Sequence, residues 1–110
     1  MNWKCTVCNL IRQGESPPEK CPKCGVPGSK YVQMSKEEWD LVERSRYTNA
    51  LHIELLTIFP RLIEIAKKGL EDNLDPRCVD LFAHLLKEAS FLESSTKAEI
   101  EGHMKKGKWG

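Results

Sequence analysis

Apolar residues recur at helical spacing along two long stretches of the chain. One stretch begins near residue 36. The other carries a single stripe made of Cys78, Phe82, Leu85, Ala89, Leu92 and Ile100. Recurrence every three or four residues is typical of an amphipathic helix, because 3.6 residues make one turn. The pattern predicts two helices, at about residues 36–68 and 76–106.

Capping signals mark the ends of both predicted helices. Ser35 to Glu38 has the form of a capping box, and Asp75-Pro76 is typical of an N-cap followed by the first helical residue. Lys67-Lys68-Gly69 and Lys105-Lys106-Gly107 each place cations in a last turn and glycine at the left-handed cap position. The remaining residues, 108–110, are expected to be frayed.

The middle of the first helix is more apolar than one stripe allows. Between Ala50 and Ala66, apolar residues cover most of the helix surface, and one partner helix cannot bury them all. We therefore expect a homodimer in which two helical hairpins form a four-helix bundle. Pro60 lies inside this stretch and removes a backbone hydrogen bond, so the helix is predicted to be kinked or split there.

The first 34 residues differ in composition from the rest. They hold four of the five cysteines and four of the six prolines, which predicts a loop-rich module with little core of its own. Cys5 and Cys8 form one CxxC pair, and Cys21 and Cys24 form a second pair twelve residues later. Two such pairs are typical of a tetrahedral iron or zinc site with four thiolate ligands. Structural thiols without a metal are the alternative.

The charge balance and the absence of targeting segments indicate which classes of partner and location to expect. Lys and Arg total 17 and Asp and Glu total 16, so no global charge points to nucleic acid. No apolar stretch precedes the first cysteine pair, and none is long enough to span a membrane. We expect a cytoplasmic protein, in which reduced cysteines bind metal rather than form disulfides.

The flanks of the cysteine pairs carry a family resemblance. Trp3 precedes the first pair, Pro22 and Gly25 flank the second, and Tyr31 follows it; the other matching residues are Lys4, Thr6, Val7, Gly14, Pro17, Pro18, Glu19, Lys20, Lys23 and Pro27. This run resembles the rubredoxin-like domain of rubrerythrins over about residues 1–34. Its N-terminal place is similar to that in reverse rubrerythrins, where it precedes a ferritin-like helical domain.

The resemblance implies a small β-ribbon with an Fe(Cys)4 centre that cycles between Fe(III) and Fe(II). It also implies that Cys8 and Cys24 lie nearest the surface. Asn9 departs from the usual glycine, although asparagine is the best substitute in a left-handed turn. Leu10-Ile11 is a second departure, and neither removes a ligand. The flanking aromatic residues favour iron over zinc.

The sequence thus predicts an α+β chain with a rubredoxin-like metal-binding domain at 1–34 and a helical domain at 35–110. The first functional hypothesis is one-electron transfer through one iron per chain to a redox partner protein, by a carrier rather than an enzyme, in oxidative-stress defence as the resemblance implies. The alternative is a zinc-ribbon adapter with no redox role. A peroxidase is a third hypothesis, but the two Glu-x-x-His motifs of a di-iron site are absent.

A fifth cysteine, Cys78, lies in the first turn of the second predicted helix. A helix N-terminus lowers the pKa of a thiol, so Cys78 is a candidate reactive residue. Its place on the apolar stripe instead favours a small buried hydrophobic residue.

Overall fold

A computed structural model describes all residues, 1–110, as three short strands followed by two long helices. This confirms the α+β class with a helical hairpin. Packing divides the chain into two compact units, Met1–Glu43 and Arg44–Gly110. The division expected at residue 34 follows composition, whereas the packing keeps the first turns of α1 (Lys36–Asp72) with the sheet. Neither helix is long and apolar enough to cross a membrane.

The first unit is built on a three-stranded antiparallel sheet. Its order is β2 (Ile11–Gln13), β1 (Asn2–Cys5), β3 (Tyr31–Gln33), with the 3-10 turn η1 (Gly28–Lys30) before β3. Its main buried cluster consists of Cys5, Cys21 and Tyr31, with Trp3, Cys8, Leu10 and Val26 packed against it. Thiols therefore make up much of this small core.

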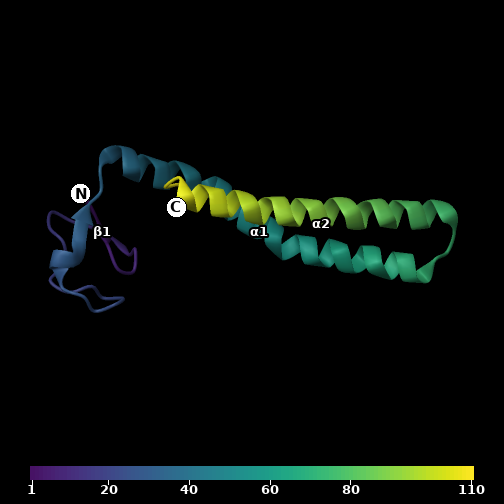
Figure 1. Cartoon of the computed structure of the whole chain (residues 1–110), viewed down its shortest axis with the longest axis horizontal. Coiled ribbons are helices and arrows are strands. Elements are labelled where there is room, and N and C mark those ends of the chain that lie inside the picture. The colour runs from purple at the N-terminus through teal and green to yellow at the C-terminus, as the bar shows by residue number, and fades with distance from the viewer. The chain divides into compact units, whose positions relative to one another are not determined.

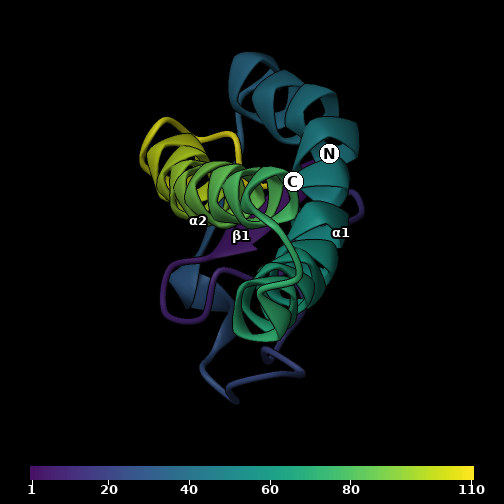
Figure 2. The ribbon, with the colours of Figure 1, turned by 90° about the vertical axis from the view of Figure 1, so that its right-hand side faces the viewer.

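The second unit is an antiparallel hairpin. Residues 44–72 of α1 run beside α2 (Pro76–Lys105), and residues 73–75 connect them (Figure 1). The end-on view shows α1 and α2 as two separate helices joined by this connection (Figure 2). Small or compact residues dominate the buried positions of the pair, including Ala66, Ala89 and Thr96.

Most of the predicted caps are confirmed. Glu38 Oε2 accepts from the Ser35 N–H at 3.0 Å and Ser35 Oγ from the Glu38 N–H at 3.1 Å, which is a complete capping box. Asp75 caps α2 by accepting from the Cys78 N–H at 2.8 Å. At the other end, Gly107 has φ 76° and the Lys108 N–H donates to His103 O at 2.8 Å, as in a Schellman motif.

The predicted end of α1 is wrong. Gly69 does not end the helix, which continues to Asp72 and stops where Asn73 adopts the left-handed conformation, φ 48°. Gly69 has a different role, because a Cβ there would lie 2.3 Å from carbons of the Phe82 ring. The missing side chain lets α1 accommodate Phe82 of α2. Sequence spacing alone cannot distinguish this contact from a cap.

Pro60 does not split α1, which is a single helix from Lys36 to Asp72 with the proline inside it. Proline sacrifices one intrahelical hydrogen bond, and tertiary packing of the neighbouring residues offsets this loss. Phe59, immediately before it, is 6% exposed.

The C-terminal residues are not frayed, contrary to the expectation. Asn49, a buried residue of α1, donates through Nδ2 to Lys108 O at 2.8 Å and to Gly110 O at 3.1 Å. Its Oδ1 lies 2.7 Å from His103 Nδ1. Because Nδ2 is the donor to both carbonyls, Oδ1 is the acceptor and His103 Nδ1 carries the proton. One asparagine thus fastens the end of α2 and the tail to α1.

The two helical glycines provide a matched test of this packing. Gly69→Ala should destabilise the protein by about 1–3 kcal/mol, because the added methyl group overlaps Phe82. Gly102→Ala should stabilise it by about 0.5–1 kcal/mol, since nothing lies within 4 Å of the place the new methyl group would take and alanine favours the helix. Urea unfolding followed by circular dichroism measures both. Equal effects of the two substitutions would contradict the assigned role of Gly69.

Candidate metal centre

Each CxxC pair forms a knuckle, and the two knuckles repeat the same backbone hydrogen bonds. In the first, the Cys5 N–H donates to Leu10 O at 2.9 Å and Cys5 O accepts from the Asn9 N–H at 3.0 Å. In the second, the Cys21 N–H donates to Val26 O at 2.8 Å and Cys21 O accepts from the Gly25 N–H at 2.9 Å. These bonds close both turns in the same way.

The fifth residue of each knuckle has a left-handed backbone, as expected. Asn9 has φ 66° and Gly25 has φ 82°. Asparagine tolerates this region better than most non-glycine residues, so the departure at Asn9 preserves the turn. The departure at Leu10 is also accommodated, because Leu10 packs on the buried cluster, as Val26 does from the second knuckle.

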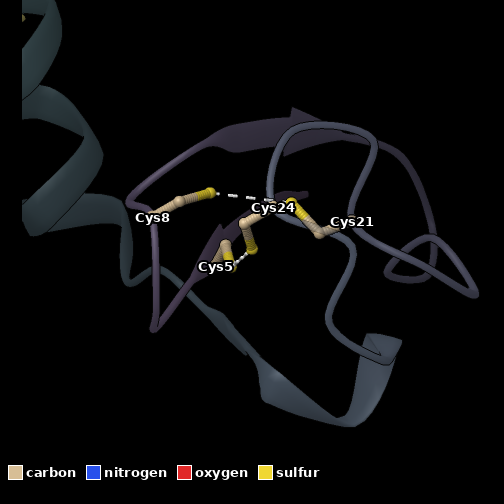
Figure 3. A group of neighbouring side chains, drawn as sticks. All are labelled: Cys5, Cys8, Cys21 and Cys24. Carbon is tan, nitrogen blue, oxygen red and sulfur yellow. Dashed lines mark hydrogen bonds between the residues drawn. The ribbon is translucent and has the colours of Figure 1, made fainter.

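The four cysteine sulfurs converge on one point. Figure 3 shows the four side chains directed toward one another. All four Sγ atoms lie within 4.8 Å of one another; Cys5 Sγ is 3.7 Å from Cys24 Sγ, and Cys8 Sγ is 3.6 Å from Cys21 Sγ. Sulfurs about 2.3 Å from a tetrahedral metal lie about 3.8 Å apart, so the arrangement fits such an ion. No other group of three or more His, Cys, Asp or Glu residues in the chain could hold a metal.

The electrostatics of the cluster also fit a cation. Burial raises the pKa of the Cys21 thiol. The Cys24 backbone N–H and the Tyr31 hydroxyl have the opposite effect and outweigh burial, so the pKa falls to about 5. The Val26 backbone N–H lowers the pKa of Cys24, yet burial and the other three cysteines raise it to about 12. Neighbouring sulfurs thus prevent all four from ionising together. A divalent or trivalent ion removes that repulsion and releases the remaining protons.

The ligands differ in exposure between their first and second members. Cys5 and Cys21 are buried, Cys8 is half-buried and Cys24 is exposed. This agrees with the expectation that Cys8 and Cys24 lie nearest the surface.

Tyr31 closes the buried side of the cluster. It is 6% exposed and pairs with Cys5 across the sheet. The Cys21 sulfur, together with burial, raises the pKa of the Tyr31 phenol, so the hydroxyl stays protonated and available as a donor. The sequence indicated Tyr31 only as a flanking aromatic residue of the family resemblance, because the place of its side chain among the cysteines depends on the fold.

The other candidate groups form no second centre. Glu99 Oε2 lies 3.8 Å from His103 Nε2, and the rings of His52 and His103 are 5.9 Å apart, but the chain brings no third ligand to them. Cys78 is half-buried, and its sulfur donates to Asp75 Oδ2 at 3.5 Å. This contact, burial and the acidic neighbours raise the pKa of Cys78, which disfavours a reactive thiolate.

Comparisons with known proteins agree with this geometry. The family described as "Rubrerythrin, rubredoxin-like domain" matches residues 3–32. Reverse rubrerythrin-1 of Clostridium acetobutylicum is 49% identical over 101 residues, which is 92% of this chain, so the similarity extends into the helices. The chain spans 47% of that relative, about half its length. No solved structure matches the chain.

The metal assignment is tested by two cysteine variants. Cys8→Ser should lose the bound metal and unfold the sheet unit, because metal binding supplies much of the folding free energy of so small a core. Cys78→Ser is the matched control and should keep one metal per chain. Elemental analysis and circular dichroism of both proteins give the answer. Full retention of metal and fold by Cys8→Ser would refute the site.

Proposed function

Since residues 3–32 are a rubredoxin-like domain of the rubrerythrin kind, we propose that the protein is a one-electron carrier with a single iron. Cys5, Cys8, Cys21 and Cys24 hold that iron. Bound there, iron supplies an Fe(III)/Fe(II) couple. The observation that carries the proposal is the convergence of four sulfurs within 4.8 Å inside this domain. The alternative, a zinc-ribbon adapter, has the same ligands and no redox role.

The chain's own groups favour reversible transfer. Backbone N–H groups of Val7 and Cys8 donate to the Cys5 sulfur, and those of Lys23 and Cys24 donate to the Cys21 sulfur. These fixed dipoles stabilise the negative charge of a thiolate centre before and after reduction. Rigid knuckles keep the ligands in place, so little reorganisation accompanies the electron.

The proposed partner is a redox protein that docks over the exposed ligands. Val7, between the two cysteines of the first knuckle, is 58% exposed beside the accessible Cys8. An apolar contact at this point brings a partner close to the centre without a covalent step. We place the carrier in the cytoplasm, where thiols remain reduced, and in a peroxide- and oxygen-defence pathway by family analogy.

The redox proposal predicts a visible change. Protein produced with ample iron and purified without added metal should contain one iron per chain and absorb visible light. Dithionite should bleach it, and air should restore the colour, because the ligands stay in place through the cycle. Absorption spectroscopy with elemental analysis measures this. Stoichiometric zinc in that preparation would instead support the adapter.

We further propose that a second copy of the chain covers an apolar face of the hairpin. On α1 this face consists of Leu51, Leu55, Ile58, Leu62 and Ile65, which follow one another by alternating steps of four and three residues. Such steps keep side chains on one stripe. Four of the five are 37–44% exposed, although all are large and apolar.

The apolar face continues on α2. Each stripe residue of α1 directly precedes a buried or half-buried residue, as Ile58 precedes Phe59. Leu81 and Leu92 of α2 have the same offset, because they precede Phe82 and Glu93. In an antiparallel pair, equal offsets put both stripes on the same side of the hairpin. That side therefore carries apolar residues of both helices, interrupted on α2 by Glu88, which precedes the buried Ala89 in the same way.

A two-fold contact between two such surfaces makes a four-helix bundle, in which every helix has two neighbours. The six most exposed side chains of the face would each gain about 1 kcal/mol on burial, since a fully buried Leu or Ile gains about 1.5–3 kcal/mol. Two copies together gain about 12 kcal/mol. Association costs about 4–15 kcal/mol of lost freedom, so the gain is of the size that a dimer needs.

Two isoleucines of α1 provide the test. Ile58→Asp places a charge in the proposed interface and should convert the dimer to a monomer. Ile53→Asp is the control, because Ile53 is two residues from Leu51 and Leu55 and thus on another side of the helix. Sedimentation equilibrium at micromolar concentration measures both. A wild-type monomer would contradict the dimer.

A further inference from the structure

Two buried polar atoms of the sheet unit, Asn2 Oδ1 and the Tyr31 hydroxyl oxygen, have no hydrogen-bond partner in the protein. The Tyr31 side chain is 6% exposed. A buried hydroxyl without a partner is costly, and phenylalanine would fill the same space without that cost. The presence of the hydroxyl therefore calls for an acceptor.

The residues around Tyr31 indicate that a cysteine sulfur is the acceptor of its hydroxyl. Tyr31 begins β3, lies opposite Cys5 in the sheet, and shares the buried cluster with Cys5 and Cys21. The other members packed against this cluster are Trp3, Leu10, Val26 and Cys8, so cysteines are its only side chains with an acceptor atom. Among these cysteines, Cys21 raises the pKa of the Tyr31 phenol most, which singles out its sulfur as the acceptor. Thiolates accept hydrogen bonds better than thiols, so metal loading strengthens this contact.

We infer that the Tyr31 hydroxyl donates a hydrogen bond to the Cys21 thiolate of the metal centre and thereby raises its reduction potential. This rests on the proposed iron function. Reduction adds one electron to the centre and increases the negative charge on its sulfurs. A donor aimed at one sulfur stabilises the reduced state more than the oxidised state.

The buried position of this hydrogen bond increases its effect on the metal centre. Cys21 is buried, so water does not compete for its sulfur and the local dielectric is low. Cys24, in the same knuckle, is exposed and can accept from water. Tyr31 is thus a positioning residue for the buried half of the centre, and its effect is independent of partner docking at Cys8 and Cys24.

The two tyrosines of the chain allow a matched experiment. Tyr31→Phe keeps the ring and removes only the hydroxyl, whereas Tyr47→Phe makes the same change at a side chain that is 73% exposed, on α1. In iron-loaded protein, Tyr31→Phe should lower the reduced-to-oxidised ratio at a fixed potential several-fold. A tenfold change equals 59 mV for a one-electron couple. Tyr47→Phe should leave the ratio unchanged. An unchanged ratio in iron-loaded Tyr31→Phe would overturn the inference.

Two further measurements separate this inference from the iron proposal. In cobalt(II)-loaded protein, Tyr31→Phe should shift the sulfur-to-metal charge-transfer band to lower energy, because the thiolate loses a donor. Wild-type protein loaded with an NMR-active cadmium isotope should show scalar coupling between the Tyr31 hydroxyl proton and the metal. Neither depends on which metal the cell supplies, and the cadmium measurement needs no variant. Absence of both effects would refute the hydrogen bond even if iron is the native metal.

Discussion

The mutual repulsion of four sulfurs held in one small space is the constraint on which the sheet unit depends. The chain places four Sγ atoms within 4.8 Å of one another, and its main buried cluster contains two of these cysteines with a third packed against it. Without a cation, the cluster cannot ionise fully, as the pKa of about 12 at Cys24 indicates. With one, the same sulfurs become four bonds that join β1, the two knuckles and the approach to β3. Metal binding and folding of this unit are therefore one event.

The helical hairpin is held together by the packing of apolar side chains and not by a charged centre. The Phe82 ring of α2 packs directly on Gly69 of α1. At the other end of the hairpin, Asn49 of α1 holds the end of α2 and the C-terminal residues by three polar contacts. The helix pair uses one stripe of each helix and leaves a second one exposed. The similarity to reverse rubrerythrin-1 covers most of this hairpin but only 47% of that relative. The proposed dimer covers the exposed stripes with an identical copy.

Local chemistry made part of this structure predictable. The cysteine spacing, the Ser35 to Glu38 box and the left-handed turns at Asn9 and Gly25 each depend on a few adjacent residues, and all agree with expectation. The errors involve distant partners. Gly69 has the sequence context of a helix cap, but a glycine is needed there because Phe82 of the other helix fills the space of a side chain. The ordered tail depends on Asn49, which is far away in sequence. The hydroxyl of Tyr31 belongs to the same class, since its acceptor is brought near only by the folded knuckles.

Iron in a tetrahedral thiolate site is the central claim, and X-ray absorption at the metal of the protein as isolated tests it most directly. The edge identifies the element, and the fine structure reports the number and distance of its neighbours. The account predicts an iron edge and a single shell of four sulfurs at about 2.3 Å. A stoichiometric zinc edge, or an iron shell that contains nitrogen or oxygen in place of any of the four sulfurs, would contradict it.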